Sequence, residues 1–73
     1  MIQGFNVIQL SVNGQVRRFE PGANIAQLLD ALELTGKRVA VERNGEIVPR
    51  GRYTATRLTD GDALEIVVAV GGG

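Results

Sequence analysis

Two Asn-Gly pairs, Asn13-Gly14 and Asn44-Gly45, restrict the possible folds of this sequence more than any other feature. Both residue types tolerate a positive φ angle, which the tightest two-residue β-hairpin turns require. The segment before each pair alternates between apolar and polar residues, with the period of two that is typical of a half-buried strand. The sequence therefore predicts two β-hairpins.

The first predicted hairpin joins a strand over residues 8–12 to a returning strand over residues 15–20. A two-residue turn places Phe19 on the core face of the returning strand and Val16 on the solvent face, whereas a three-residue loop would reverse the two. We favour Phe19 on the core face because it is the larger apolar group. The returning strand has few apolar residues, so we expect it at an edge of the sheet.

One helix is predicted after this hairpin. Asn24 is a good N-cap, and Gln27 occupies the position that completes a capping box. Gly36 can adopt the left-handed conformation that ends a helix, so we expect the helix to stop there. We interpret the apolar stripe between them as the face that packs on the sheet, not as a groove for a partner. The stripe consists of Ile25, Leu28, Leu29 and Leu32.

Three more strands are predicted, over residues 39–42, 46–48 and 63–70. Pro49 ends the second of them, because proline has no N–H group to donate. The third is the most strand-like segment of the chain, with a nearly unbroken run of isoleucine and valine. Such a run is expected of a central strand that is covered on both sides, or covered near its ends by a partner.

The order of these elements predicts an α+β fold, with a mixed sheet of four to five strands and one main helix packed on one face. The first and last strands are the most apolar, so we expect them to lie side by side in the centre, where parallel pairing is possible. The 73 residues correspond to one domain, 1–73, with residues 1–7 as an N-terminal extension and residues 71–73 as a flexible tail. The expected core is Leu10, Val12, Phe19, Ile25, Leu28, Leu29, Leu32, Val39, Val41, Leu64 and Ile66.

The composition excludes several classes of function. The chain contains no cysteine and no histidine, which removes disulfides, thiol chemistry, most zinc sites and most general-base mechanisms. Eight basic residues balance eight acidic ones, so no basic face for nucleic acid is expected. No apolar run approaches the roughly 20 residues that span a bilayer, and the N-terminus lacks the features of a signal peptide. We therefore expect a cytoplasmic protein with neither a nucleic-acid nor a membrane partner.

The internal side chains offer no active site. Asp60 and Asp62 flank a turn glycine and are interpreted as turn formers rather than as an acid–base pair. Ser11 has no histidine to activate it. The arginines are scattered, and Tyr53 alone among them is too little for a stacking platform. We expect neither a metal site nor a catalytic centre inside the domain.

The C-terminus differs, because three glycines follow the apolar last strand. A chain without side chains can enter a narrow enzyme cleft in which any Cβ atom would clash. It also presents the carboxylate of Gly73 without a shielding neighbour. The alternative is a flexible end without function, and the residues alone leave both interpretations open.

Five segments together resemble the ThiS family of sulfur carriers, which have the ubiquitin-like β-grasp fold and supply sulfur for the thiazole ring of thiamine. The strongest likeness lies in residues 44–50 (Asn-Gly-Glu-Ile-Val-Pro-Arg) and in the terminal Val-Gly-Gly-Gly. Two features depart from the family: residues 1–7 precede its usual first strand, and Tyr53 stands where tryptophan is common. The five segments are residues 8–14, 21–29, 39–50, 58–62 and 66–73.

The resemblance implies a carrier rather than an enzyme. An E1-like adenylyltransferase of the ThiF type would use ATP to activate the carboxylate of Gly73, and a persulfide sulfur would replace AMP to leave a thiocarboxylate. A cysteine desulfurase would be a typical sulfur donor, and a thiazole synthase of the ThiG type would accept the sulfur. Gly71 and Gly72 would form the thin arm, and Val68 and Val70 would contact partners at its base. The carrier would be a monomer with no bound cofactor.

Other functions of the same fold remain alternatives. The small subunit of molybdopterin synthase shares the tail chemistry, but the short length and residues 44–50 argue against it. A ubiquitin-like protein modifier would instead form an amide bond to lysine. An RNA-binding β-grasp module would need a basic face, which a net charge of zero does not favour. A bare interaction domain with an incidental tail is the fourth alternative.

Overall fold

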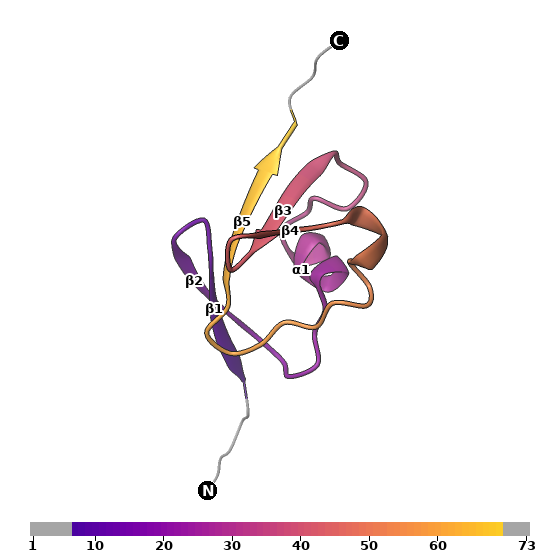
Figure 1. The fold of residues 1–73 in the computed structure, drawn as a ribbon. Coiled ribbons are helices and arrows are strands. Elements are labelled where there is room, and N and C mark those ends of the chain that lie inside the picture. Colours follow the sequence, from indigo (N-terminus) through magenta and orange to yellow (C-terminus); the bar gives the residue numbers. More distant parts are fainter. Residues whose placement is uncertain (1–6, 70–73) are drawn as a thin grey trace, which may run out of the picture.

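A five-stranded mixed sheet with one helix against one face makes up the part of the chain that the computed structural model describes, residues 7–69 (Figure 1). The strand order is β2-β1-β5-β3-β4. The predicted tail over residues 71–73, Val70, and the predicted extension except Val7 lie outside the described residues. The elements are β1 (Ile8–Val12), β2 (Gln15–Phe19), α1 (Ile25–Ala31), β3 (Val39–Arg43), β4 (Glu46–Val48), the 3₁₀ turn η1 (Arg50–Arg52) and β5 (Ala63–Val68).

Both Asn-Gly pairs form the predicted hairpin turns. Asn13 and Asn44 have φ angles of 51° and 52°, and the glycine after each is also left-handed. The first turn has two residues, so Phe19 is half-buried against the core and Val16 is 59% exposed. Strand β2 lies at the edge of the sheet, as its low apolar content predicts.

Strand β5 lies in the centre of the sheet, where its apolar run predicts it. It pairs in parallel with β1 through Ser11–Ala63 and Val12–Leu64, and antiparallel with β3. The apolar run also predicted that β5 could be covered on both faces, but within residues 7–69 the structure shows coverage on one face. Helix α1 covers one face alone, so Val67 on the other face is 65% exposed. The central position of β5 therefore gives it strand neighbours on both sides but a helix on one face.

The helix begins as predicted and ends earlier than predicted. At its start, Gln27 N–H donates to Asn24 Oδ1 over 2.8 Å, and Asn24 N–H donates to Gln27 Oε1 over 2.9 Å. This reciprocal pair is the capping box. At its end, Leu32 is the C-cap, so the stop predicted at Gly36 is wrong.

Glu33 ends the helix instead, with a φ angle of 61°. Its N–H donates to the carbonyl of Asp30 over 3.0 Å, and Leu34 N–H donates to the carbonyl of Leu29 over 2.8 Å. These two bonds form a Schellman motif, and Leu34 packs against the core that includes Leu29. The packing of Leu34 thus outweighs the strain of a left-handed glutamate, and Gly36 is left-handed in the turn that follows.

The core lies between α1 and the covered face of the sheet. Phe19, Leu32 and Val39 are half-buried at its rim rather than inside it. Ala23 and Leu58 are buried although the periodicity did not predict them. Leu58 N–H donates to the carbonyl of Ala23 over 2.8 Å. This hydrogen bond holds the long loop between η1 and β5 beneath the helix. The buried residues are Leu10, Val12, Ala23, Ile25, Leu28, Leu29, Val41, Leu58, Leu64 and Ile66.

Asp62 connects the turn before β5 to the β3–β4 hairpin. It is 5% exposed, and its Oδ2 accepts hydrogen bonds from Arg43 Nε (2.9 Å) and Thr59 N–H (2.8 Å). Its Oδ1 accepts one from Asn44 Nδ2 (3.0 Å). Burial raises the pKa of Asp62, but the hydrogen bonds from Thr59, Asn44 and Arg43 together with the charge of Arg43 outweigh it, so the pKa lies below its ordinary value. With this strand order and one helix on one face of the sheet, the domain has the predicted ubiquitin-like β-grasp fold.

Candidate functional site

The end of β5 is the point from which the chain leaves the domain toward residues 70–73 (Figure 1). On one side β3 holds this end, through the pairing of Val39 with Val68. Beyond that pair, Ala69 N–H donates to the carbonyl of Arg38 over 2.9 Å. The last described residue is therefore still fixed to the sheet.

The other side of β5 is held by a side chain instead of a strand. Strand β1 pairs with β5 no further than Leu64. The turn residue Asn13 then takes the place of a strand: its Oδ1 accepts from Ile66 N–H (2.8 Å), and its Nδ2 donates to the Ile66 carbonyl (3.1 Å). The alternation of an antiparallel ladder directs the main-chain N–H and C=O of Val68 to this same side, where no strand of residues 7–69 pairs with them.

The structure therefore describes one of the predicted site residues. Val68 lies at the end of β5 on the same face as Leu64 and Ile66, and it is 39% exposed. The other predicted residues, Val70, Gly71, Gly72 and Gly73, lie outside the described residues, so their roles remain predictions. What the structure adds is that the chain is hydrogen-bonded to the sheet as far as Ala69.

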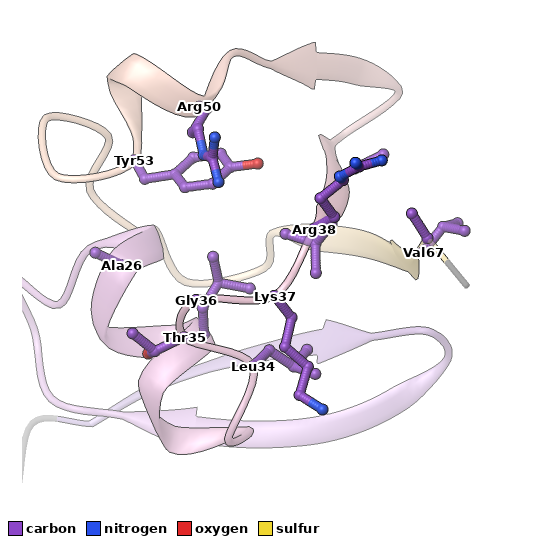
Figure 2. A pocket seen from close by; sticks show the side chains of 13 residues that line it. Ala26, Leu34, Thr35, Gly36, Lys37, Arg38, Arg50, Tyr53 and Val67 are labelled. Atoms are coloured by element: carbon purple, nitrogen blue, oxygen red, sulfur yellow. The ribbon is translucent and has the colours of Figure 1, made fainter. Parts of the chain in front are cut away.

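A pocket of about 450 Å³ lies beside this base (Figure 2). Apolar side chains from α1, the segment after it, β3 and the η1 region line it, among them Leu29, Leu34, Val39 and Tyr53. Val67 and Ala69 of the outgoing chain also line it. The pocket therefore joins the helical layer to the end of β5.

Three cations stand around this pocket: Lys37, Arg38 and Arg50. In the sequence Arg50 is one of several scattered arginines, and the fold brings it beside the other two cations. The adjacent pair Lys37-Arg38 directly before β3 was a visible signal of local positive charge, but the third cation, Arg50, comes from the other side of the β3–β4 hairpin. Only the tertiary fold brings the three charges together.

Between residues 7 and 69, no group of three or more His, Cys, Asp or Glu side chains is placed so that it could hold a metal ion. In the same part of the chain no helix is long and apolar enough to cross a membrane.

Residues 10–73 match the ThiS family. A sulfur carrier protein ThiS from Bacillus subtilis is 43% identical over 65 residues, which cover 88% of this chain and 98% of that protein. A crystal structure of the thiamine biosynthesis protein ThiS from Geobacter metallireducens superposes with a TM-score of 0.76 at 38% identity, over 90% of this chain and 100% of the other.

Two longer relatives carry a different name. Proteins named thiazole synthase from Paramagnetospirillum magneticum and Magnetococcus marinus are 44% and 38% identical over 66 residues. These residues cover 90% of this chain, whereas the chain spans 20% of the length of each of those two relatives.

Proposed function

This chain belongs to the ThiS family, and on that basis we propose that it is a sulfur carrier for the thiazole ring of thiamine. The observation that carries the proposal is the extent of the family match, which begins in β1 and includes the three glycines at 71–73. The similarity to the Bacillus subtilis carrier spans 98% of that protein, so it concerns a whole carrier rather than a shared fragment.

In the proposed chemistry, the carboxylate of Gly73 is the working group. A carboxylate resists nucleophiles, so an oxygen of Gly73 first attacks the α-phosphate of ATP and releases pyrophosphate. The terminal sulfur of a donor persulfide then attacks the acyl carbon and displaces AMP. A thiolate of a partner finally attacks the donor-side sulfur of the acyl disulfide, which leaves the thiocarboxylate on Gly73 and a disulfide between donor and thiol. This chain has no cysteine, so partners supply every thiol.

The domain itself positions the arm. The bonds at Arg38 and Asn13 fix the end of β5, so the distance from the folded domain to Gly73 is set by the few residues after Ala69. Gly71 and Gly72 add no side-chain width to that path. Val68 and Val70 are the proposed partner contacts at its base, and the exposure of Val68 supports its part in this.

The proposed function requires three partners in turn. They are an E1-like adenylyltransferase that uses ATP, a sulfur donor such as a cysteine desulfurase, and a thiazole synthase that receives the sulfur. The names of the two longer relatives support the last of these. We propose that the carrier acts as a monomeric co-substrate in the cytoplasm, rather than as an enzyme.

The test is sulfur loading followed by intact-mass spectrometry, with the adenylyltransferase of the same organism, ATP and a sulfur donor. Deleting Gly73 shifts the carboxylate by up to about 3.6 Å, and misplacement by about 1 Å can cost roughly 100-fold in rate. We therefore expect the wild type to gain the mass difference between sulfur and oxygen, and the shortened chain to gain nothing. Normal loading of the shortened chain would show that the carboxylate of Gly73 is not the working group.

A pair of glycine variants separates the arm from the fold. Gly72→Ala adds a Cβ to the arm and should slow loading. Gly51→Ala is the matched control, because its added Cβ meets no atom within 4 Å and Gly51 does not have a positive φ angle. Equal loading rates for the two variants would contradict the requirement for a bare arm.

A further inference from the structure

The pocket beside the end of β5 combines apolar walls with an unbalanced charge. Lys37, Arg38 and Arg50 line it, and no aspartate or glutamate does. The whole chain has eight basic and eight acidic residues, so the excess is local. We call this feature, defined by the three cations and the apolar residues Leu29, Leu34, Val39 and Tyr53, the basic pocket.

The three cations of the basic pocket lack carboxylate partners in the described structure. Across residues 7–69, the one ion pair joins Arg43 to Asp62. Lys37, Arg38 and Arg50 are all exposed. Exposed cations attract the carboxylates of a partner during encounter, which raises the association rate, and they form hydrogen bonds with these carboxylates after docking. The surface is thus complementary to an acidic segment.

The apolar lining of the basic pocket is also suited to bind an apolar group. Leu34, Val39 and Tyr53 are half-buried at the edge of the core, and each of them lines the pocket. A volume of about 450 Å³ is large enough for apolar side chains of a partner loop. An apolar anchor in a pocket, surrounded by polar contacts that exclude water, is the usual arrangement of a strong docking site.

The position of the basic pocket indicates which molecule reaches it. Ala69 lines the pocket, and the proposed working group at Gly73 is four residues further on, at most about 14 Å away in an extended chain. A protein that holds Gly73 in its active site therefore lies next to the pocket. Among the proposed partners, thiazole synthase has support from the two relatives of that name, in which a segment similar to this chain is part of the same polypeptide.

We propose that the basic pocket is the docking site for an acidic segment of thiazole synthase that carries an apolar side chain at its tip. The proposal rests on the proposed carrier function and adds to it the surface by which the acceptor enzyme recognises the carrier. Apolar contact in the pocket supplies affinity, and the pairing of carboxylates with Lys37, Arg38 and Arg50 supplies orientation and rate of association.

Isothermal titration calorimetry with the thiazole synthase of the same organism tests the proposal. Lys37→Glu and Arg50→Glu should each weaken binding about tenfold or more. Raised salt should weaken the binding of the wild type more than the binding of a variant that carries both substitutions. Arg17→Glu is the matched control: it makes the same charge change on exposed β2, the edge strand at the other end of the sheet, and should bind as the wild type does. Wild-type affinity in the Lys37 and Arg50 variants would overturn the proposal.

Sulfur loading by the adenylyltransferase separates this proposal from the function on which it rests. The Lys37 and Arg50 variants should load at the wild-type rate. Failure of the wild type to load would contradict the carrier function itself. If the wild type loads and binds and the variants bind equally well, the docking proposal alone is overturned. The docking proposal is also overturned if the variants lose loading and binding to the same extent.

Amide chemical shifts locate the contact independently of the variants. Addition of thiazole synthase should shift or broaden the resonances of residues 34–39, 50 and 53, and spare those of β2. Sodium phosphate alone serves as the probe for a small-anion site. If phosphate shifts these amides and thiazole synthase does not, the pocket binds small anions and the docking proposal is wrong.

Discussion

Asp62→Asn should destabilise the domain by removing the charge of a buried carboxylate at the centre of a hydrogen-bond network. All three groups that face the Asp62 carboxylate are donors: Arg43 Nε, Thr59 N–H and Asn44 Nδ2. Asparagine offers one acceptor oxygen, so its amide nitrogen must face at least one of these donors. The amide of Asn44 cannot turn around without loss, because its Oδ1 already accepts from Ala63 N–H at 2.9 Å.

The expected cost of Asp62→Asn follows from these contacts. Asp62 is buried but Arg43 is 31% exposed, so the loss of this ion pair together with one donor left without an acceptor should cost about 2–4 kcal/mol. The whole domain has a stability of about 4–11 kcal/mol, taking 0.05–0.15 kcal/mol for each of its 73 residues. Urea unfolding followed by circular dichroism at neutral pH should therefore show a large fall in the midpoint. Asp60→Asn, at an exposed carboxylate that accepts one bond from Gln9 N–H, should cost less than about 1 kcal/mol.

The pH dependence of this difference tests its electrostatic origin. The folded pKa of Asp62 lies below the unfolded value of 3.8, so the unfolded state takes up protons first as the pH falls. The stabilisation by Asp62 is thus complete well above pH 3.8 and is lost as the pH falls through the folded pKa. The difference between wild type and Asp62→Asn should shrink over that range. An unchanged difference, or equal stability at neutral pH, would refute this account of Asp62.

Two other substitutions test the base of the arm and the helix end. Asn13→Gly keeps a left-handed turn residue but loses both side-chain bonds to Ile66, so it should cost about 1–3 kcal/mol and speed hydrogen exchange at the Ile66 amide; unchanged exchange would show that Asn13 does not hold β5. Glu33→Gly relieves a left-handed non-glycine residue and should raise stability by about 0.5–1 kcal/mol in thermal unfolding; a lower melting temperature would show that Glu33 is not strained.

The hairpins and the adjacent, central placement of the first and last strands were predictable because local chemistry determines them. Asn13-Gly14 and Asn44-Gly45 specify tight turns, and the apolar run of β5 specifies its central place. The helix end was not predictable in the same way. Glu33 adopts a conformation that its own side chain disfavours, because Leu34 gains a place against the core. A tertiary contact there overrides the local signal of Gly36.

The candidate site likewise has one part that the sequence predicts and one part that only the tertiary structure shows. The importance of the terminal glycines came from the sequence and from the family resemblance, whereas the local sequence shows the pair Lys37-Arg38 but not that Arg50 lies beside it. Lys37-Arg38 and Arg50 meet only after the β3–β4 hairpin has folded. Leu58 was missed for a related reason, since it is an isolated apolar residue in a polar loop and is buried by the path of the chain beneath α1.

The most direct test of the central claim is the intact mass of the protein purified from its own host, combined with alkylation by iodoacetamide. The chain contains no cysteine, so a thiocarboxylate is its one group with thiol-like reactivity toward this reagent. If the protein is a sulfur carrier, a fraction should be heavier by the difference between sulfur and oxygen and should be alkylated once, with the label at Gly73 in tandem mass spectrometry. Only the free carboxylate, or Gly73 in amide linkage to lysines of other proteins, would contradict the carrier function.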